Sequence, residues 1–441
     1  MDDHHHHHGV RAAGADQVRT GLNWLVGGLA VLTLLGVVVL WPRGEGPDLR
    51  ASTEGLIYVD ATVTAVDTTS CTDVDEQLET ECQSVTVRIT SGPEDNDLAT
   101  FLSSQIDFSA PTFEAGDRVV LLYNRLAPEE FQYSFVEFQR TTPLLWLSAV
   151  FVVVVLVVAR WMGLRALVGL AVSLAIIVTF LLPALLRDAN PVAVALVTTS
   201  VIAFAALYIA HGIRPATTVA LVGTLVSVVV ITLGAGVLAA AAELSGLNDE
   251  NFQTLRVTAA ALDLRGIVIA GMVIGALGVL DDVTVTQVSA VQELRAANPR
   301  LPGRDLYRRA MRIGRDHIAS TINTLVLAYA GASLGLLLFL EQEGRQLGRV
   351  LTREVIAVEI VRALVGSIGL VLSVPITTAL AVIALGTRDD AEGVSERGDG
   401  APEDGPTGPE GPGRDRSVPR DQAPAPTPAW DDFAPPDDLD L

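Results

Sequence analysis

The chain has 441 residues, of which 50% are apolar and 18% are charged, and its formal net charge is −21. It contains no lysine, which excludes a nucleotide-binding P-loop, a lysine Schiff base and a Ser-Lys dyad. Outside an N-terminal histidine tract only His211 and His317 remain, so the sequence offers no histidine cluster for zinc or for a catalytic triad. We therefore expect neither ATP-driven transport by this chain alone nor a metal or other cofactor.

Apolar stretches long enough to cross a bilayer recur along the chain, and most carry no charge near the middle. A crossing needs about 20 mainly apolar residues. On this basis the sequence predicts about eight spans, at residues 23–41, 143–160, 163–182, 191–210, 215–242, 266–292, 318–340 and 354–385. The expected fold is an α-helical polytopic membrane protein, embedded in the lipid bilayer, whose seven later spans form a domain at residues 143–386.

The first span, residues 23–41, can be interpreted as a signal peptide or as a signal anchor. Arg11 and Arg19 precede the apolar run, as charged residues do in a signal peptide. The run is longer than the usual apolar region of a signal peptide, however, and no A-x-A-like cleavage site follows it. We interpret it as an anchor preceded by a disordered cytoplasmic N-terminus, residues 1–22.

Arginine positions predict the orientation of the spans. Seven arginines fall in the loop between the sixth and seventh spans, from Arg295 to Arg315. In all, ten arginines occur in loops on one side and six in short loops on the other. Because arginine and lysine concentrate in cytoplasmic loops, we expect both termini to be cytoplasmic.

This topology places residues 43–140 outside the membrane. Within residues 51–140 there are seventeen acidic residues and four arginines, which gives a net charge of about −13. Alternating runs such as Ala61–Val66, Ser84–Ile89 and Arg118–Tyr123 are typical of strands, and Gly116-Asp117 is typical of a turn. The sequence therefore predicts a small extracytoplasmic β-rich domain, a barrel or sandwich, inserted between the first and second spans.

The two cysteines of the chain, Cys71 and Cys82, both lie in this outer domain. They flank an acidic, turn-like stretch. An oxidising exterior permits a disulfide, and no C-x-x-C or Cys/His cluster indicates metal binding. We favour a structural bridge over a metal site.

From residue 387 to residue 441 the composition changes to proline, glycine and acidic residues. This segment has ten prolines, seven glycines, fifteen acidic residues and five arginines. Such a composition buries too little apolar surface to order a chain. We expect a disordered, acidic cytoplasmic tail.

The sixth predicted span contains two adjacent carboxylates, Asp281 and Asp282, near its middle. A charge at the centre of a membrane helix costs roughly 2.5–3.5 kcal/mol on insertion scales, so it normally faces a bundle interior or a wet cavity. Gly271, Gly275 and Gly278 make a small-residue face that lets a neighbouring helix approach. The pattern predicts a buried, protein-facing site.

Three segments of the membrane part resemble the YibE/F family of bacterial multi-pass membrane proteins. They are Gly275–Leu294, which begins GALGVLDDV; Gly314–Gly331, which ends NTLVLAYAG; and Glu359–Thr377, which contains EIVRALVGSIG and PIT. The stretches Ala115–Val119 and Tyr133–Arg140 are similar to the family's outer portion. The resemblance covers about residues 51–385 and implies an integral protein of the bacterial plasma membrane, while it implies little about activity.

Carried over by position, the family's aspartate falls on Asp282, its following hydroxyl on Thr286 and its later serine on Ser289. Asp281 stands where the family usually has an apolar residue. Neighbouring helix residues point about 100° apart, so the two carboxylates cannot serve one face equally. We therefore prefer Asp282 as the functional carboxylate and treat Asp281 as accessory.

Helical spacing places Asp282, Thr286, Ser289 and Glu293 on one face that runs from mid-membrane to the cytoplasmic end. This row is interpreted as a pathway, although hydroxyls that merely bond to their own helix would also explain Thr286 and Ser289. Asn323, with Thr324 beside it, is expected at the depth of Ser289 and Glu293. It serves either as interhelical glue or as part of a joint inner site.

In the eighth span Glu359 and Arg362 lie three residues apart, near the predicted outer side. They form either a structural intrahelical pair or the guard of an outer vestibule. Pro375, deeper in the same helix, frees a backbone carbonyl that can line a cavity.

These polar residues at several depths favour a secondary transporter or channel for an unknown small solute or ion, with Asp282 as the mid-membrane carboxylate. The alternative is a non-transporting receptor or assembly factor whose outer β domain binds a ligand or partner. An enzyme is not expected, because the one catalytic-looking string, G-x-S-x-G at Gly331–Gly335, falls inside an apolar helix. Expected partners are the bilayer, the transported species, and a second copy or another protein, but no nucleic acid.

Overall fold

The structure is a computed structural model that describes residues 9–44, 56–72, 79–104, 111–128, 131–187, 189–247, 262–342 and 352–385. The chain divides into two units, Met1–Asp389 and Asp390–Leu441. The predicted disordered tail at residues 387–441 lies outside the described residues, as do residues 1–8 of the predicted disordered N-terminus.

The β domain follows the first helix and precedes the second, as predicted. It is one antiparallel sheet with the strand order β3-β2-β1-β4-β5, built from β1 (Leu56–Thr72), β2 (Glu79–Ile89), β3 (Leu98–Ser104), β4 (Arg118–Asn124) and β5 (Tyr133–Phe138). Register shifts at Val63/Ala65 and at Val120/Leu121 interrupt the ladders. Such bulges bend a sheet strongly, and here the sheet curls into a half-barrel.

Aromatic side chains fill the concave side of the half-barrel. Phe101 on β3 stacks on Phe135 of β5, with ring centroids 6.2 Å apart, although these strands are at opposite edges of the sheet. Phe113 packs edge-on against both rings, at 5.5 and 4.9 Å. The domain therefore has its own apolar core, as the alternating strand patterns indicated.

The first helix, α1 (Gly9–Leu40), begins earlier than the sequence analysis suggested. We predicted disorder for residues 1–22, but residues 9–22 are helical. This stretch contains helix-favouring residues such as Ala12, Ala13 and Gln17 and no proline. Once the apolar run is helical, each added residue extends the helix at little cost, so the boundary moves toward the N-terminus.

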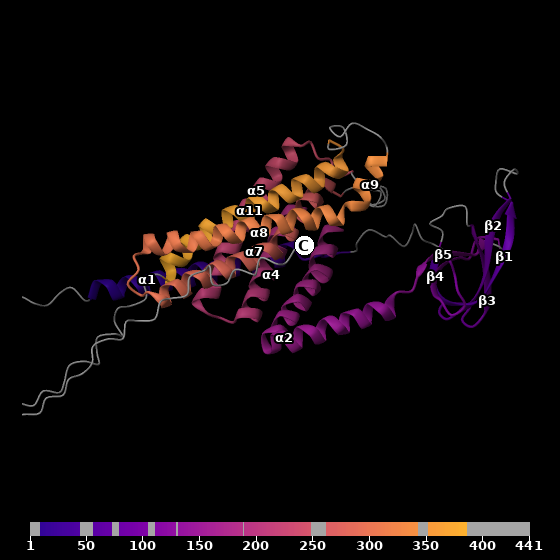
Figure 1. The fold of residues 1–441 in the computed structure, drawn as a ribbon, viewed down its shortest axis with the longest axis horizontal. Coiled ribbons are helices and arrows are strands. Elements are labelled where there is room, and N and C mark those ends of the chain that lie inside the picture. The colour runs from indigo at the N-terminus through magenta and orange to yellow at the C-terminus, as the bar shows by residue number, and fades with distance from the viewer. Residues whose placement is uncertain are drawn as a thin grey trace, which may run out of the picture. The chain divides into compact units, whose positions relative to one another are not determined.

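The helical part continues through the elements named in Figure 1. They are α2 (Thr141–Ile176), the π-helical turn η3 (Ile177–Leu181), α3 (Leu182–Leu185), α4 (Pro191–His211), α5 (Pro215–Ala241), α7 (Leu264–Ala297), α8 (Gly303–Ala332), α9 (Leu334–Gln342) and α11 (Glu354–Leu385). Among the described residues six helices are long and apolar enough to cross a membrane: Thr20–Leu40, Thr141–Leu185, Pro191–His211, Pro215–Ala241, Leu264–Ala297 and Glu354–Leu385. The protein is therefore a multi-pass membrane protein.

The helix count differs from the predicted eight at two places. The continuous run Thr141–Leu185 contains a sharp break at Arg160, whose φ of 51° and ψ of −127° are not helical. The bend is visible in α2 of Figure 1, between the second and third predicted spans. The seventh predicted span, residues 318–340, is divided between α8 and α9 and is not among the six candidates. Eight crossings remain a prediction.

Capping residues define where the central helices begin. Asn190 accepts a hydrogen bond from the backbone N–H of Ala193 at 2.9 Å, with Pro191 as the first residue of α4. Asp263 caps α7 in the same way, through the N–H of Gly266 at 2.9 Å. Glu354, the first residue of α11, accepts hydrogen bonds from the N–H groups of Ser245 and Gly246 at 2.6 and 2.7 Å, and so ties α11 to the segment that follows α5.

Helices α5, α7 and α11 form the centre of the bundle and bury most of its core. Glycines allow the close approach. A Cβ atom on Gly223 of α5 would lie 2.5 Å from the hydroxyl oxygen of Thr377 of α11, and Gly369 of α11 lies directly against Ile231. Small residues at such crossings let membrane helices pack at short distance. The polar residues described next lie among these three helices.

The arginine-rich helix ends lie together. Val219 near the start of α5, Val291 near the end of α7, Leu306 near the start of α8 and Ala381 near the end of α11 share one buried cluster. The loop with seven arginines, between α7 and α8, is therefore at the same end of the bundle as the start of α5 and the end of α11. Which side of the membrane that end faces stays a prediction.

Candidate functional site

The two adjacent aspartates of α7 have different surroundings. Asp281 is partly buried, and its Oδ1 atom has no hydrogen-bond partner among the described residues. The Asp282 side chain is 74% exposed, and its Oδ2 lies 3.9 Å from Nε2 of His317 on α8. Our expectation that Asp282 faces the protein interior is therefore wrong for the single chain.

The rotation of α7 explains this difference. Leu280, Val283, Thr284 and Gln287 are all nearly fully buried, and they pack toward α5, α8 and α11. With these residues turned inward, residue 281 falls at the margin of the buried face and residue 282 falls outside it, since successive residues point about 100° apart. Asp281, which the sequence analysis treated as accessory, is thus the acid nearer the core.

A buried polar row runs along α7 from Asp281 through Thr284 to Gln287, at steps of three residues. The Thr284 hydroxyl lies 2.8 Å from the hydroxyl of Thr224 on α5, and also donates to the backbone carbonyl of Asp281 at 3.2 Å. The Gln287 amide donates to the Thr378 hydroxyl at 2.7 Å and to the Ala310 carbonyl at 3.0 Å. This row joins four helices through side-chain hydrogen bonds.

Further hydroxyl groups from α5 and α11 surround the row. Ser227, Ser373 and Thr377 are all buried. Ser227 and Ser373 donate to carbonyls of their own helices, those of Gly223 and Leu370, at 2.7 and 2.8 Å. The Thr377 hydroxyl has no partner within the described part of the chain, as is the case for Asp281 Oδ1. Buried polar atoms are nearly always paired, so each of these two unpaired atoms calls for an explanation.

These residues were largely absent from the sequence analysis. Thr224, Thr284, Gln287, Thr377 and Thr378 were not selected, because a single hydroxyl or amide in a long apolar helix is usually packing glue. A usable signal existed: Asp281, Thr284 and Gln287 recur at three-residue spacing, so they share a face.

The predicted pathway residues share a face, but that face is exposed. Asp282, Thr286, Ser289 and Glu293 are all exposed along one side of α7. The buried face of α7 is instead the one with Thr284 and Gln287. The role of the row is not tested by its placement.

The joint inner site expected from Asn323, Ser289 and Glu293 does not form. Helix α8 runs antiparallel to α7, with Ala310 beside Gln287 and His317 beside Asp282. Asn323 therefore lies beyond Asp282, on the side away from Ser289. It is exposed together with Thr324, whose hydroxyl donates to the carbonyl of Ser320 at 3.1 Å.

Glu359 and Arg362 form the intrahelical pair that their spacing predicted. Arg362 Nη1 donates to Glu359 Oε1 at 2.6 Å, and both side chains are more than two-thirds buried. In the β domain Cys82 is buried and disulfide-bonded. The side chain of Cys71 lies outside the described residues, so the bridge between the two cysteines stays a prediction.

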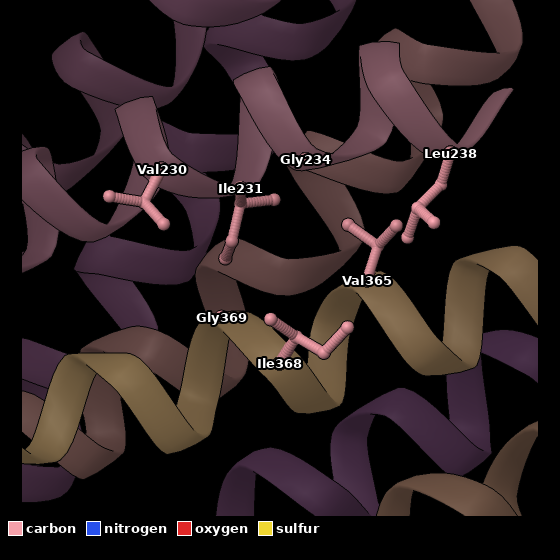
Figure 2. A pocket seen from close by; sticks show the side chains of 7 residues that line it. All are labelled: Val230, Ile231, Gly234, Leu238, Val365, Ile368 and Gly369. Atoms are coloured by element: carbon pink, nitrogen blue, oxygen red, sulfur yellow. The ribbon is translucent and has the colours of Figure 1, made fainter. Parts of the chain in front are cut away.

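The cavity between α5 and α11 is apolar and small, about 30 Å³. Figure 2 shows its lining, which includes Ile231 and Leu238 of α5 and Val365 and Ile368 of α11. No polar side chain reaches it, so it is not a site for a charged solute. In the described residues no three His, Cys, Asp or Glu side chains gather as a metal site would require.

The YibE/F-like protein family matches residues 147–387, which is more than half of the chain. The chain belongs to the YibE/F-like family. The matched region of this YibE/F-like protein runs from α2 to just past α11 and contains the whole buried polar row, whereas the β domain lies outside it. No curated protein and no solved structure matches the chain.

Proposed function

We propose that this YibE/F-like protein moves a proton or another small cation across the bacterial plasma membrane, with Asp281 as the mid-membrane carboxylate. The observation that carries the proposal is the unpaired Oδ1 of Asp281, partly buried at the middle of the central helix. A carboxylate in such a position is costly, and the residues found there usually serve ion or proton pathways.

The neighbouring groups suit this role. The hydroxyls of Thr224 and Thr284, 2.8 Å apart, can each donate or accept a hydrogen bond. They therefore can orient toward a protonated carboxyl, a bound cation or water as the carboxylate changes state.

The adjacent aspartates give the site an entrance. Asp281 is partly buried, with an unpaired Oδ1, while Asp282 lies on the exposed face beside His317. Because Asp281 and Asp282 are adjacent in α7, a proton or cation that reaches Asp282 from outside can pass directly to Asp281. In this arrangement Asp282 and His317 collect the ion, and Asp281 holds it between the central helices.

The experiment is proton and alkali-cation flux into proteoliposomes that contain the full chain. Asp281→Asn keeps the shape of the side chain but cannot titrate, so flux should fall to the level of protein-free liposomes. The matched control is Asp305→Asn, which removes a partly exposed aspartate at the start of α8, outside the polar row, and should leave flux unchanged.

Wild-type flux no greater than that of empty liposomes, over a range of ions and pH, would contradict the transport proposal. It would favour the receptor or assembly alternative, in which the buried polar row only specifies how the helices pack.

A further inference from the structure

One face of α7 is largely uncovered by the described residues, apart from Tyr329 and His317 of α8 at its edge. Between Gly266 and Glu293 every exposed residue of the helix falls on this face, at steps of three or four residues: Gly271, Gly275, Gly278, Asp282, Thr286, Ser289 and Glu293. Steps of three and four keep residues on one side of a helix. We call these seven residues the open face of α7.

The open face has two halves of different chemistry. The first half consists of glycines, and a Cβ atom placed on Gly271 or Gly278 would find no atom within 4 Å. The second half is polar and includes two carboxylates, Asp282 and Glu293. A Cβ atom on Gly275 would meet only the Tyr329 hydroxyl, at 3.7 Å, so the helix backbone is exposed along the glycine half, although α7 otherwise packs on α4, α5, α8 and α11.

Such a face is unsuited to lipid. Charged and polar side chains in the middle of a membrane helix face protein or water, because hydrocarbon leaves them without partners. Glycines spaced four apart, as Gly271 and Gly275 are, let a second helix approach closely. Helix α1 does not fill this place, since its described contacts are with α4, α5 and α11.

We propose that the open face of α7 is the contact surface between two copies of this chain, related by a two-fold axis. The surface is suited to itself. Its glycines give a flat groove for an identical helix, its acids are exposed, and the adjoining α8 carries exposed arginines, among them Arg308 and Arg312. A two-fold contact requires one surface that carries both members of each interacting pair.

The charges match in depth as well. The Gln287 amide bonds to the carbonyl of Ala310, so the arginines around residue 310 lie at the level of Ser289 and Glu293. A second copy therefore brings arginines to acids at the same depth. Near the two-fold axis the two Asp282 carboxylates would repel each other. Each lies 3.9 Å from a His317 imidazole, and a positive charge on that imidazole offsets the repulsion.

The second copy completes a site that is unfinished in one chain. In a single chain Asp282 is 74% exposed within a membrane-spanning helix. In the pair, Asp282 and His317 from both copies are enclosed by protein at mid-membrane. This inference does not rest on transport, because it would hold for a receptor with the same helices.

The test is thiol cross-linking of the full chain in native membranes. Thr286→Cys and Ser289→Cys place single thiols on the open face, and both should give a covalent dimer with a short bifunctional reagent. The controls are Val229→Cys on α5 and Leu364→Cys on α11, whose native side chains are 50% and 51% exposed on other sides of the bundle. They should give none.

A second arm uses a matched pair of glycines. Gly278→Leu fills the groove and should lower cross-linking at Thr286→Cys about tenfold, which corresponds to about 1.4 kcal/mol. Gly236 on α5 also faces open space, so Gly236→Leu should leave cross-linking at Thr286→Cys unchanged. Comparison of the two variants therefore removes any general effect of replacing a helical glycine by leucine.

Three results would overturn the proposal. They are absence of dimer at both Thr286 and Ser289, equal cross-linking at Leu364, or equal effects of the two leucine substitutions. Capture of a different protein or of lipid alone by the Thr286 thiol would assign the open face to that partner instead.

Discussion

At the scale of single residues, the rotation of α7 decides the chemistry of the site. Leu280 and Val283 are almost completely buried and set which side of the helix faces α5 and α11. As a consequence Asp281 lies at the edge of the core and Asp282 lies outside it, although the two are adjacent. The two carboxylates therefore have different surroundings, and in the proposed function Asp281 holds the ion while Asp282 receives it.

Gln287 provides a test of the buried row at this scale. Its amide is 3% exposed and bonds to Thr378 and to the carbonyl of Ala310. Gln287→Leu should lower the free energy of unfolding by about 1–2 kcal/mol, because both partners lose their donor in a dry interior. The measurement is unfolding of the purified protein in mixed micelles.

Gln292→Leu is the control for Gln287→Leu, because Gln292 lies on the same helix, is only partly buried and is not one of the open-face residues. It should change the unfolding free energy by less than about 0.5 kcal/mol. Equal effects of the two substitutions would show that the row contributes nothing specific.

At the scale of elements, sequence patterns identified what shares a face but not which face is buried. The row from Asp282 to Glu293 does lie on one side of α7, as its spacing predicted. Helix α7 has polar residues on two sides, however, so periodicity could not choose between them. The choice is made by groups of α5 and α11 that come from distant parts of the chain, such as Thr224, which bonds to Thr284, and Thr378, which bonds to Gln287.

The β domain was more predictable than the helical site, for a physical reason. Strand alternation directly reports which residues enter the core, and Val85, Val87 and Ile89 alternate into it. The curl into a half-barrel could not be predicted in the same way, because it depends on bulges and on contacts between edge strands. The start of α1 was also missed, since helix ends are set by cooperative extension.

A tyrosine pair in the β domain gives a pH test at this scale. The Glu94 carboxylate accepts hydrogen bonds from Tyr123 at 2.9 Å and from Tyr133 at 2.6 Å. The hydrogen bond to Glu94 raises the pKa of Tyr123, and burial followed by the bond to Glu94 raises the pKa of Tyr133. A tyrosine whose pKa is raised on folding contributes stability that is fully present below its pKa in the unfolded chain, near 10. This contribution is lost as the pH rises through the higher pKa of the folded protein.

We therefore expect ultraviolet titration of the folded protein to show tyrosines that ionise only above pH of about 10. Glu94→Gln removes the negative charge that opposes ionisation, so this late component should move toward lower pH. An identical titration curve for Glu94→Gln would contradict the assignment, and Tyr123→Phe with Tyr133→Phe should remove the component altogether.

At the scale of the whole molecule, a multi-pass helical bundle holds the polar site and a separate β half-barrel sits between its first two helices in the chain. The helix ends that carry most arginines share the cluster of Val219, Val291, Leu306 and Ala381. Arginine asymmetry predicts that this end is cytoplasmic and that the β domain is outside.

Labelling of single cysteines with a membrane-impermeant thiol reagent tests that orientation. In intact cells a cysteine at Ala115, in an exposed turn of the β domain, should react, whereas one at Arg308 should react only after the membrane is opened. Reaction of both positions from the same side would rule out the predicted topology.

The most direct measurement of the central claim is the rank order of two substitutions in one flux assay. Asp281→Asn and Asp282→Asn differ by one residue, remove the same charge and keep the same side-chain shape. If Asp281 holds the ion among the central helices, Asp281→Asn abolishes flux, while Asp282→Asn only slows it, because the ion can still reach the core without its collector. Full loss of flux in Asp282→Asn together with normal flux in Asp281→Asn would contradict this account.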